Sequence, residues 1–154
     1  METKEAKASG NDLPLSWKGV VMIGNFIRGK TVEKSKRLLR EVMEEKTAVP
    51  FTRFNKDRGH KKGEIAAGRY PVRAAGEILN LLESAESNAV NMGMNANNLV
   101  ISRFIGNKGS TSWRSGRKRR RQAKRAHVEI YLSEVKQEKK KEKKAVEKKG
   151  VVKK

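Results

Sequence analysis

The stretch that decides the fold is LVISRFIGNKGSTSWRSGRKRRRQAKRAHVEIYL, residues 99–132, in which two strand-like segments flank a strongly basic insert. Residues 99–105 are mostly apolar, and residues 126–132 alternate between apolar and polar side chains, as a half-buried strand does. Between them, Asn107 to Arg125 carries nine Lys or Arg residues and no Asp or Glu. Two strands around one long insert predict a hairpin, and we refer to residues 106–126 as the hairpin arm.

The positive charge is concentrated in two segments. Of the net charge of +20, residues 103–125 carry +10 and residues 136–154 carry +7, so the remaining residues carry +3. A nearly neutral body with a charged internal arm indicates a polyanionic partner that the arm reaches into. Arginines outnumber lysines six to two in residues 113–125, whereas all ten basic residues of the tail are lysines. Because the guanidinium group matches phosphate geometry, the arm favours fitted contacts and the tail favours diffuse attraction.

The length of 154 residues predicts one domain with tails. We expect a flexible N-terminal segment over residues 1–12, a single domain over 13–135 that includes the hairpin arm, and a disordered Lys-rich tail over 136–154. The chain has no cysteine and only two histidines, so neither disulfides nor a metal site nor another cofactor is expected. No apolar run approaches the roughly 20 residues of a membrane span, so we expect a soluble intracellular protein without a membrane partner.

Periodic apolar residues predict three helices in the body. They cover Leu15 to Ile27 with Ser16 as N-cap, the segment from the N-cap Thr31 to about Glu45, and Pro71 to about Asn91. In the first helix Gly19 and Gly24 each cost about 1 kcal/mol relative to Ala, and a glycine in such a place often lets another backbone come close. Val49 to Phe54 is expected to be a short extended edge segment because it contains a proline.

The remaining polar segments do not resemble a catalytic site. Acidic residues lie mainly on the expected helix surfaces, and Asp57 and His60 share a basic glycine-rich loop, residues 55–68, without a nucleotide-binding pattern. We therefore expect no enzymatic activity. Trp113 stands among charged residues, where it either stacks on a base or ribose or packs on the hairpin stem, whereas Trp17 is expected to pack at the core or its edge.

Several motifs in their order resemble a known family. They are Arg28-Gly29-Lys30, VPFTRFN (49–55), GRYP (68–71), LLESAESNA (81–89), NNLVI (97–101), NK (107–108) and HVEI (127–130). Over roughly residues 16–134 the chain is similar to the universal large-subunit ribosomal protein family numbered twenty-two in bacteria and seventeen in eukaryotes, in its archaeal and eukaryotic branch. Singly the motifs are modest, but in this order and spacing they are specific.

The resemblance implies an α+β fold with three helices packed on a small antiparallel sheet and a long basic β-hairpin arm. It further implies a structural constituent of the large ribosomal subunit in the cytoplasm, which binds large-subunit rRNA, aids its assembly and lines the polypeptide exit tunnel with the hairpin. Its implied partners are large-subunit rRNA, neighbouring large-subunit proteins and the nascent polypeptide near the hairpin tip.

The resemblance and the charge pattern together select the candidate rRNA-binding residues. They are Lys18, Arg53, Asn55, Lys56, Arg58, His60, Lys61, Lys62, Arg69, Arg103, Asn107, Lys108, Trp113, Arg114, Arg117, Lys118, Arg119, Arg120, Arg121, Lys124 and Arg125. The alternative is a free-standing basic RNA chaperone or a nucleic-acid-packaging protein that uses the same charges on many targets.

Overall fold

The computed structural model describes residues 4–134, except for the side chain of Lys118. The predicted Lys-rich tail lies outside the described residues. Within them, an antiparallel three-stranded sheet has the order β1-β5-β4, with β5 (Ala126–Glu134) between β1 (Glu5–Leu13) and β4 (Leu99–Lys108). Val128, Ile130 and Leu132 of β5 are fully buried and alternate with partly exposed residues, which confirms the predicted alternation.

Strand β1 corrects the prediction of a flexible N-terminal segment, at least from Glu5 onward. Ala6 pairs with Leu132 and Gly10 with Val128, so β1 covers the second edge of β5. The two alanines of β1, Ala6 and Ala8, are buried. Small residues without β propensity form this strand because its hydrogen-bonding partner and its packing partner, α3, are supplied by distant parts of the chain.

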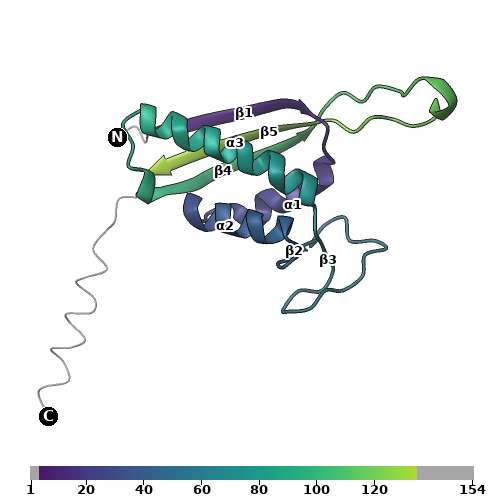
Figure 1. The fold of residues 1–154 in the computed structure, drawn as a ribbon, viewed down its shortest axis with the longest axis horizontal. Helices are drawn as coiled ribbons and strands as arrows, with labels where there is room; N and C mark the ends of the chain where they lie inside the picture. Colours follow the sequence, from purple (N-terminus) through teal and green to yellow (C-terminus); the bar gives the residue numbers. More distant parts are fainter. Residues whose placement is uncertain (1–3, 135–154) are drawn as a thin grey trace, which may run out of the picture.

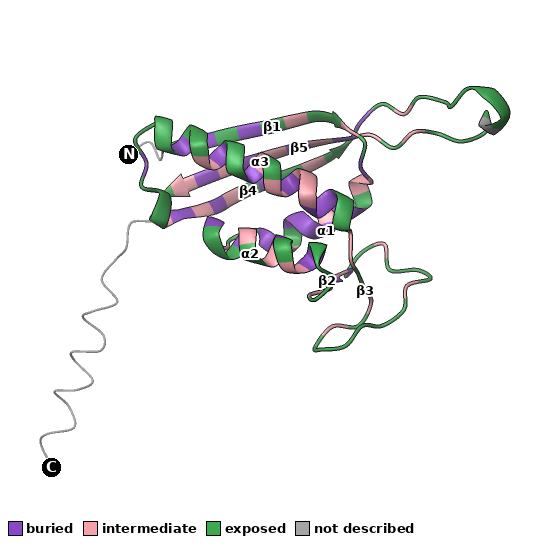
Figure 2. Ribbon diagram, in the orientation of Figure 1, coloured by how far each residue is buried: buried purple, intermediate pink, exposed green. Residues whose placement is uncertain are grey.

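Three helices pack on the sheet, which confirms the predicted α+β class. In the described region, α1 (Trp17–Ile27) packs on β4, α3 (Val72–Asn91) packs on β1 and β5, and α2 (Val32–Met43) packs on α3. The buried residues line the inner faces of the helices and one face of the sheet (Figure 2). A short 3-10 helix, η1 (Ala96–Asn98), leads into β4. The core therefore holds the ends of β4 and β5 in register at the point where the hairpin arm begins.

The helix ends lie close to the predicted residues. Ser16 is the N-cap of α1 but makes no side-chain cap hydrogen bond. The hydroxyl of Thr31 accepts a hydrogen bond from the backbone N–H of Lys34 at 3.4 Å and caps α2. Pro71 precedes α3 as its N-cap, so this helix begins one residue later than predicted.

Gly24 in α1 has a different neighbour from the predicted one. A Cβ atom at this position would lie 2.2 Å from Cδ1 of Phe104, so the glycine makes room for a buried aromatic ring of β4 and not for a backbone. The absence of a side chain lets α1 sit directly on β4, close to the start of the hairpin arm.

The predicted extended segment at Val49 is shorter than expected. Only β2 (Val49–Pro50) is a strand, and it pairs with β3 (Gly68–Arg69) in a separate two-stranded sheet. We call the segment between them, residues 51–67, the β2–β3 loop. In the view of Figure 1, this loop and the hairpin arm extend from the same end of the body.

Candidate nucleic-acid interface

The outer part of the hairpin arm, residues 109–125, projects from the sheet as two legs (Figure 1). The β4–β5 ladder ends at the pair Lys108 and Ala126. Beyond it the legs are joined by backbone hydrogen bonds from Gly109 to Arg125 (3.0 Å), Ala123 to Ser112 (2.8 Å) and Arg114 to Arg121 (2.9 Å). A 3-10 turn, η2 (Gly116–Lys118), closes the tip. Beyond the β4–β5 ladder the two segments of the arm are thus joined by a few backbone hydrogen bonds and do not form a continuous β-ribbon.

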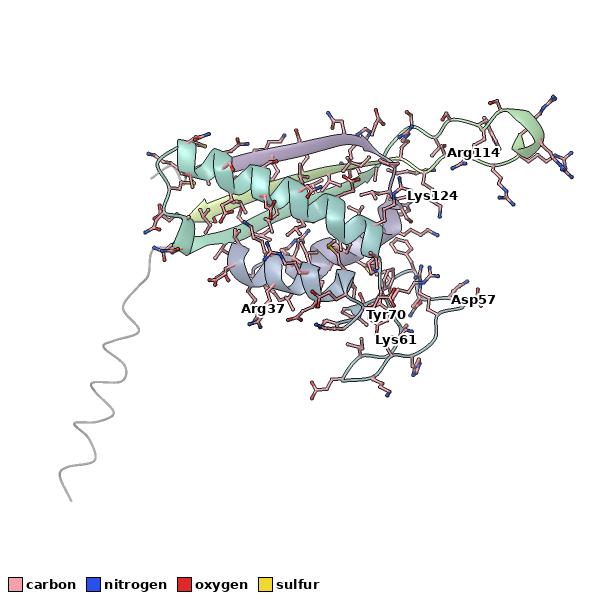
Figure 3. The ribbon with its side chains drawn as sticks, viewed as in Figure 1. Arg37, Asp57, Lys61, Tyr70, Arg114 and Lys124 are labelled. Carbon is pink, nitrogen blue, oxygen red and sulfur yellow. The ribbon has the colours of Figure 1, made fainter. Side chains whose placement is uncertain are left out.

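The arginines in the outer part of the arm have no acidic partners among the described residues. Arg114, Arg117, Arg119, Arg120 and Arg121 are exposed, and none forms an ion pair within residues 4–134. Figure 3 shows Lys124 near the base of the arm and Arg114 farther out. A projecting segment with this unneutralised charge is a binding surface for an anion of extended shape.

Trp113 lies on the arm opposite Gln122, with which it forms an isolated β-bridge. Its side chain is 65% exposed. Of the two predicted roles, packing on the hairpin stem receives no support from this position, whereas an exposed indole is available to stack on a base or ribose.

The β2–β3 loop presents a second group of cations. Arg53, Lys56, Lys61 and Lys62 are exposed, as are Asn55 and His60. The ammonium group of Lys61 lies 5.2 Å from the ring centroid of Tyr70, and Figure 3 shows both residues near the base of this loop. The predicted contact residues of the loop are therefore on the surface, with one exception.

Arg58 is the exception because its guanidinium group is turned into the loop. Its central carbon lies 4.1 Å from the ring centroid of Phe51, and its Nε donates a 2.6 Å hydrogen bond to the carbonyl of Phe54. Its Nη1 is buried without a hydrogen-bond partner among the described residues. Burial, and then the nearby charge of Arg69, lower the pKa of Arg58. The geometry fits a residue that shapes the loop.

Other predicted residues lie outside the outer part of the arm and outside the β2–β3 loop. Arg103 is on the exposed face of the sheet, where it pairs with Glu5 at 2.6 Å and lies 5.0 Å from the ring centroid of Tyr131. Its charge is thus neutralised within the body. Arg69 is exposed on β3, and Asn107 and Lys108 are exposed at the end of β4. Lys18 is exposed in the first turn of α1.

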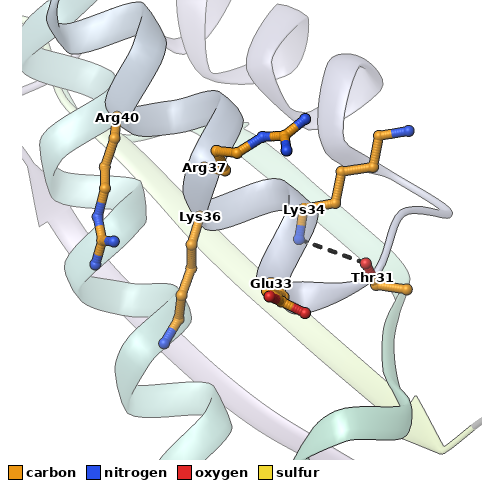
Figure 4. A pocket seen from close by; sticks show the side chains of 6 residues that line it. All are labelled: Thr31, Glu33, Lys34, Lys36, Arg37 and Arg40. Carbon is orange, nitrogen blue, oxygen red and sulfur yellow. Dashed lines mark hydrogen bonds between the residues drawn. The ribbon is translucent and has the colours of Figure 1, made fainter.

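A hollow on α2 carries further cations that are not among the candidates predicted from the sequence. Figure 4 shows its lining, which consists of Thr31, Glu33, Lys34, Lys36, Arg37 and Arg40. Three of these cations have acidic partners: Lys36 pairs with Glu86, Arg37 with Glu41 and Arg40 with Glu83. These pairs leave a surface of much smaller net charge than that of the arm.

Groupings of side chains that could bind a metal ion are absent from the described residues. Residues 4–134 contain no cluster of three or more His, Cys, Asp or Glu side chains that could hold a metal ion. Asp57 and His60 share the β2–β3 loop, but no hydrogen bond or ion pair joins these two described side chains. Nor does any helix in the described part of the chain have the length and apolarity needed to cross a membrane.

Comparison with known proteins identifies the family. The sequence profile of the family described as ribosomal protein L22p/L17e matches residues 8–135. The chain belongs to the ribosomal protein L22p/L17e family. It is 44% identical over 110 residues to the large ribosomal subunit protein uL22 of Archaeoglobus fulgidus, covering 70% of this chain and 71% of that protein. It is 38% identical over 138 residues to uL22 of Nanoarchaeum equitans, covering 85% and 79%, and to uL22 of Methanococcus aeolicus, covering 85% and 90%.

This L22p/L17e protein also places residues together that no sequence pattern had linked. Ser16, Trp17 and Lys18 at the start of α1 lie beside Lys108 and the returning leg of the arm, where they line one cleft. By sequence, Lys18, Lys108, Lys124 and Arg125 are separate candidates. Trp17, which is expected at the core or its edge, is partly buried and packs against the core. The pairing of β4 with β5 and the packing of α1 on β4 bring these residues together. No local pattern in the sequence indicates this arrangement.

Proposed function

We propose that the protein is a structural constituent of the large ribosomal subunit that binds large-subunit rRNA and helps to assemble it. The relatives from Archaeoglobus fulgidus and Nanoarchaeum equitans are named as large ribosomal subunit proteins, which supports this assignment and a location on cytoplasmic ribosomes. The observation that carries the proposal is the projecting arm whose exposed arginines have no acidic partner within residues 4–134.

The binding mechanism follows from the kind of charges and their exposure. Cations that neutralise RNA phosphates release condensed counterions, and this release supplies affinity without base recognition. The arm arginines add bidentate contacts to phosphate oxygens, and the exposed Trp113 adds stacking. Neighbouring large-subunit proteins are the further partners that this role requires. Because this mechanism needs neither a catalytic group nor a cofactor, the proposed role is not enzymatic.

The rRNA-binding proposal is tested with transcribed large-subunit rRNA of Archaeoglobus fulgidus, whose uL22 is a 44% identical relative. We expect tight binding, and we expect the logarithm of the binding constant to fall linearly with the logarithm of the salt concentration. Sedimentation of cell extracts through sucrose gradients at high salt then separates the alternatives. A subunit constituent stays with the large subunit, whereas a free-standing RNA chaperone or packaging protein dissociates from it.

The proposed exit-tunnel role places the tip of the arm next to the nascent polypeptide. The chain has no cysteine, so Ser115→Cys beside the tip turn gives a single attachment site for a photocrosslinker. Ribosomes that carry this variant and a stalled nascent chain are expected to yield a crosslink between the two. Ser87→Cys, exposed on α3, is the matched control and should give none. Equal crosslinking from both positions would argue against the tunnel role.

A further inference from the structure

A cleft at the base of the arm joins three parts of the chain. It measures about 290 Å³ and lies between the start of α1, the end of β4 and the returning leg of the arm. Its lining residues are Ser16, Trp17, Lys18, Lys108, Thr111, Gln122, Ala123, Lys124 and Arg125. Residues about 90 positions apart in the sequence thus face one space, where one ligand can contact the body and the arm together.

The charge of this cleft is of one sign. Lys18, Lys108, Lys124 and Arg125 line it, and no Asp or Glu does. None of the four forms an ion pair with another residue of the described range 4–134. Arg125 donates a 3.1 Å hydrogen bond to the carbonyl of Asp12, whose carboxylate lies 3.8 Å from Nε2 of His127. Cations that converge without an acidic partner repel one another, so an anion in the cleft is stabilised.

We infer that this cleft binds a backbone phosphate of the RNA strand that continues along the arm. The inference rests on the proposed function and assigns one contact within it. Lys124 and Arg125 belong both to the cleft and to the arm, so an anion here is continuous with the strand that the arm binds. The volume is near the lower end of small-ligand sites, about 300 Å³, and suits one nucleotide-sized group.

The polar uncharged lining supports a phosphodiester over an acidic peptide. Thr111 and Gln122 supply a hydroxyl and an amide, which are the groups that commonly bond phosphate and sugar oxygens. Trp17 contributes an aromatic wall, and it also packs edge-on against Phe54 of the β2–β3 loop at 5.0 Å between ring centroids. A phosphate held jointly by α1 and the arm would fix the direction of the arm relative to the body.

The first measurement compares two double variants with equal loss of charge. Lys18→Ala with Lys124→Ala removes two cations from the cleft, and Lys34→Ala with Arg37→Ala removes two from α2. Binding is measured with the Archaeoglobus fulgidus rRNA transcript at physiological salt. We expect the cleft variant to bind about tenfold more weakly than wild type and the α2 variant to lose less than about threefold. Thermal unfolding checks folding, and Lys18→Arg with Lys124→Arg is expected to keep most of the affinity.

The second measurement reads the cleft itself. Trp113→Phe leaves Trp17 as the only tryptophan of the chain, and its quenching by acrylamide reports access to the cleft. Saturation with the transcript is expected to protect Trp17, whereas inorganic phosphate or poly-glutamate is not. The inference is overturned, while the proposed function stands, if Trp17 stays fully quenchable with RNA bound and the two double variants lose RNA affinity equally. Equal protection by free phosphate or by poly-glutamate also overturns it. If wild-type protein does not bind the transcript at all, the proposed function and the inference both fail.

Discussion

At the scale of single residues, Gly24 and Phe104 set how closely α1 approaches β4. In Gly24→Ala the new Cβ would lie 2.2 Å from the buried ring of Phe104. Overpacking of this kind costs about 1–3 kcal/mol, more than the helix-propensity gain of about 1 kcal/mol. We expect urea unfolding to show a net loss of up to about 2 kcal/mol. Gly19→Ala on the same helix meets no atom within 4 Å and is expected to match or exceed wild type in stability. Equal stability of the two variants would mean that the ring moves freely.

The structural role of Arg58 in the β2–β3 loop could not be predicted from the sequence. Its charge placed it among the contact candidates, but its stacking on Phe51 and its hydrogen bond to Phe54 depend on the fold of the loop. Phe54 and Asp57 have positive φ angles of 57°, a strained conformation that Arg58 helps to hold.

Arg58→Lys keeps the charge but loses the planar stack and the Nε donor. We therefore expect faster amide hydrogen exchange throughout residues 51–67 and a loss of about 1–2 kcal/mol in unfolding free energy. Arg53→Lys is the matched control because Arg53 is exposed, and it should leave exchange unchanged. Weaker RNA binding by Arg58→Lys with unaltered loop exchange would instead assign Arg58 a direct contact.

At the scale of elements, the sequence predicted the strands and helices whose own residues show a periodic pattern. The alternation of β5 and the apolar stripe of α3 are visible in the sequence because each element presents one face to the core. Strand β1 was missed because EAKASGNDL has no such pattern. It forms through pairs such as Ala6 with Leu132 and through the hydrogen bond from the Asn88 amide to the Lys7 carbonyl at 2.9 Å. The cleft at the arm base was missed for the same reason, since three distant segments build it.

Removing positive charge from the arm gives a clear prediction for rRNA binding. Arg119, Arg120 and Arg121 changed together to Ala should weaken rRNA binding and reduce the salt slope by roughly 0.7–0.9 for each RNA phosphate that the variant no longer neutralises. The midpoint of thermal unfolding should stay within about 1 °C of wild type, because these side chains are exposed and lie on the arm. Changing the same residues to Lys should keep the salt slope and lose only the bidentate part of the affinity. A fall in stability equal to the fall in binding would contradict a separate arm.

At the scale of the whole molecule, the segregation of charge assigns different kinetic roles to its parts. The body pairs many of its charges, as Lys36 with Glu86 and Arg103 with Glu5 do, and it positions the arm. The tail beyond residue 135 adds +7 in lysines and glutamates by sequence and lies outside the described residues. Point charges that are not fitted to a site raise association rates, whereas fitted contacts slow dissociation.

Truncation after Val135 tests this division of roles. Without the tail, we expect association with the rRNA transcript to slow by about tenfold at low ionic strength and far less at physiological salt, because screening shortens the reach of the removed charges. The dissociation rate should change little, in contrast to the triple arm variant, which should dissociate faster. Stopped-flow mixing at two salt concentrations measures both rates. In cells, the truncated protein should enter mature large subunits at full occupancy after slower assembly. Faster dissociation of the truncated protein, or its absence from mature subunits, would show that tail lysines make fitted contacts. The tail would then not act on the association rate alone.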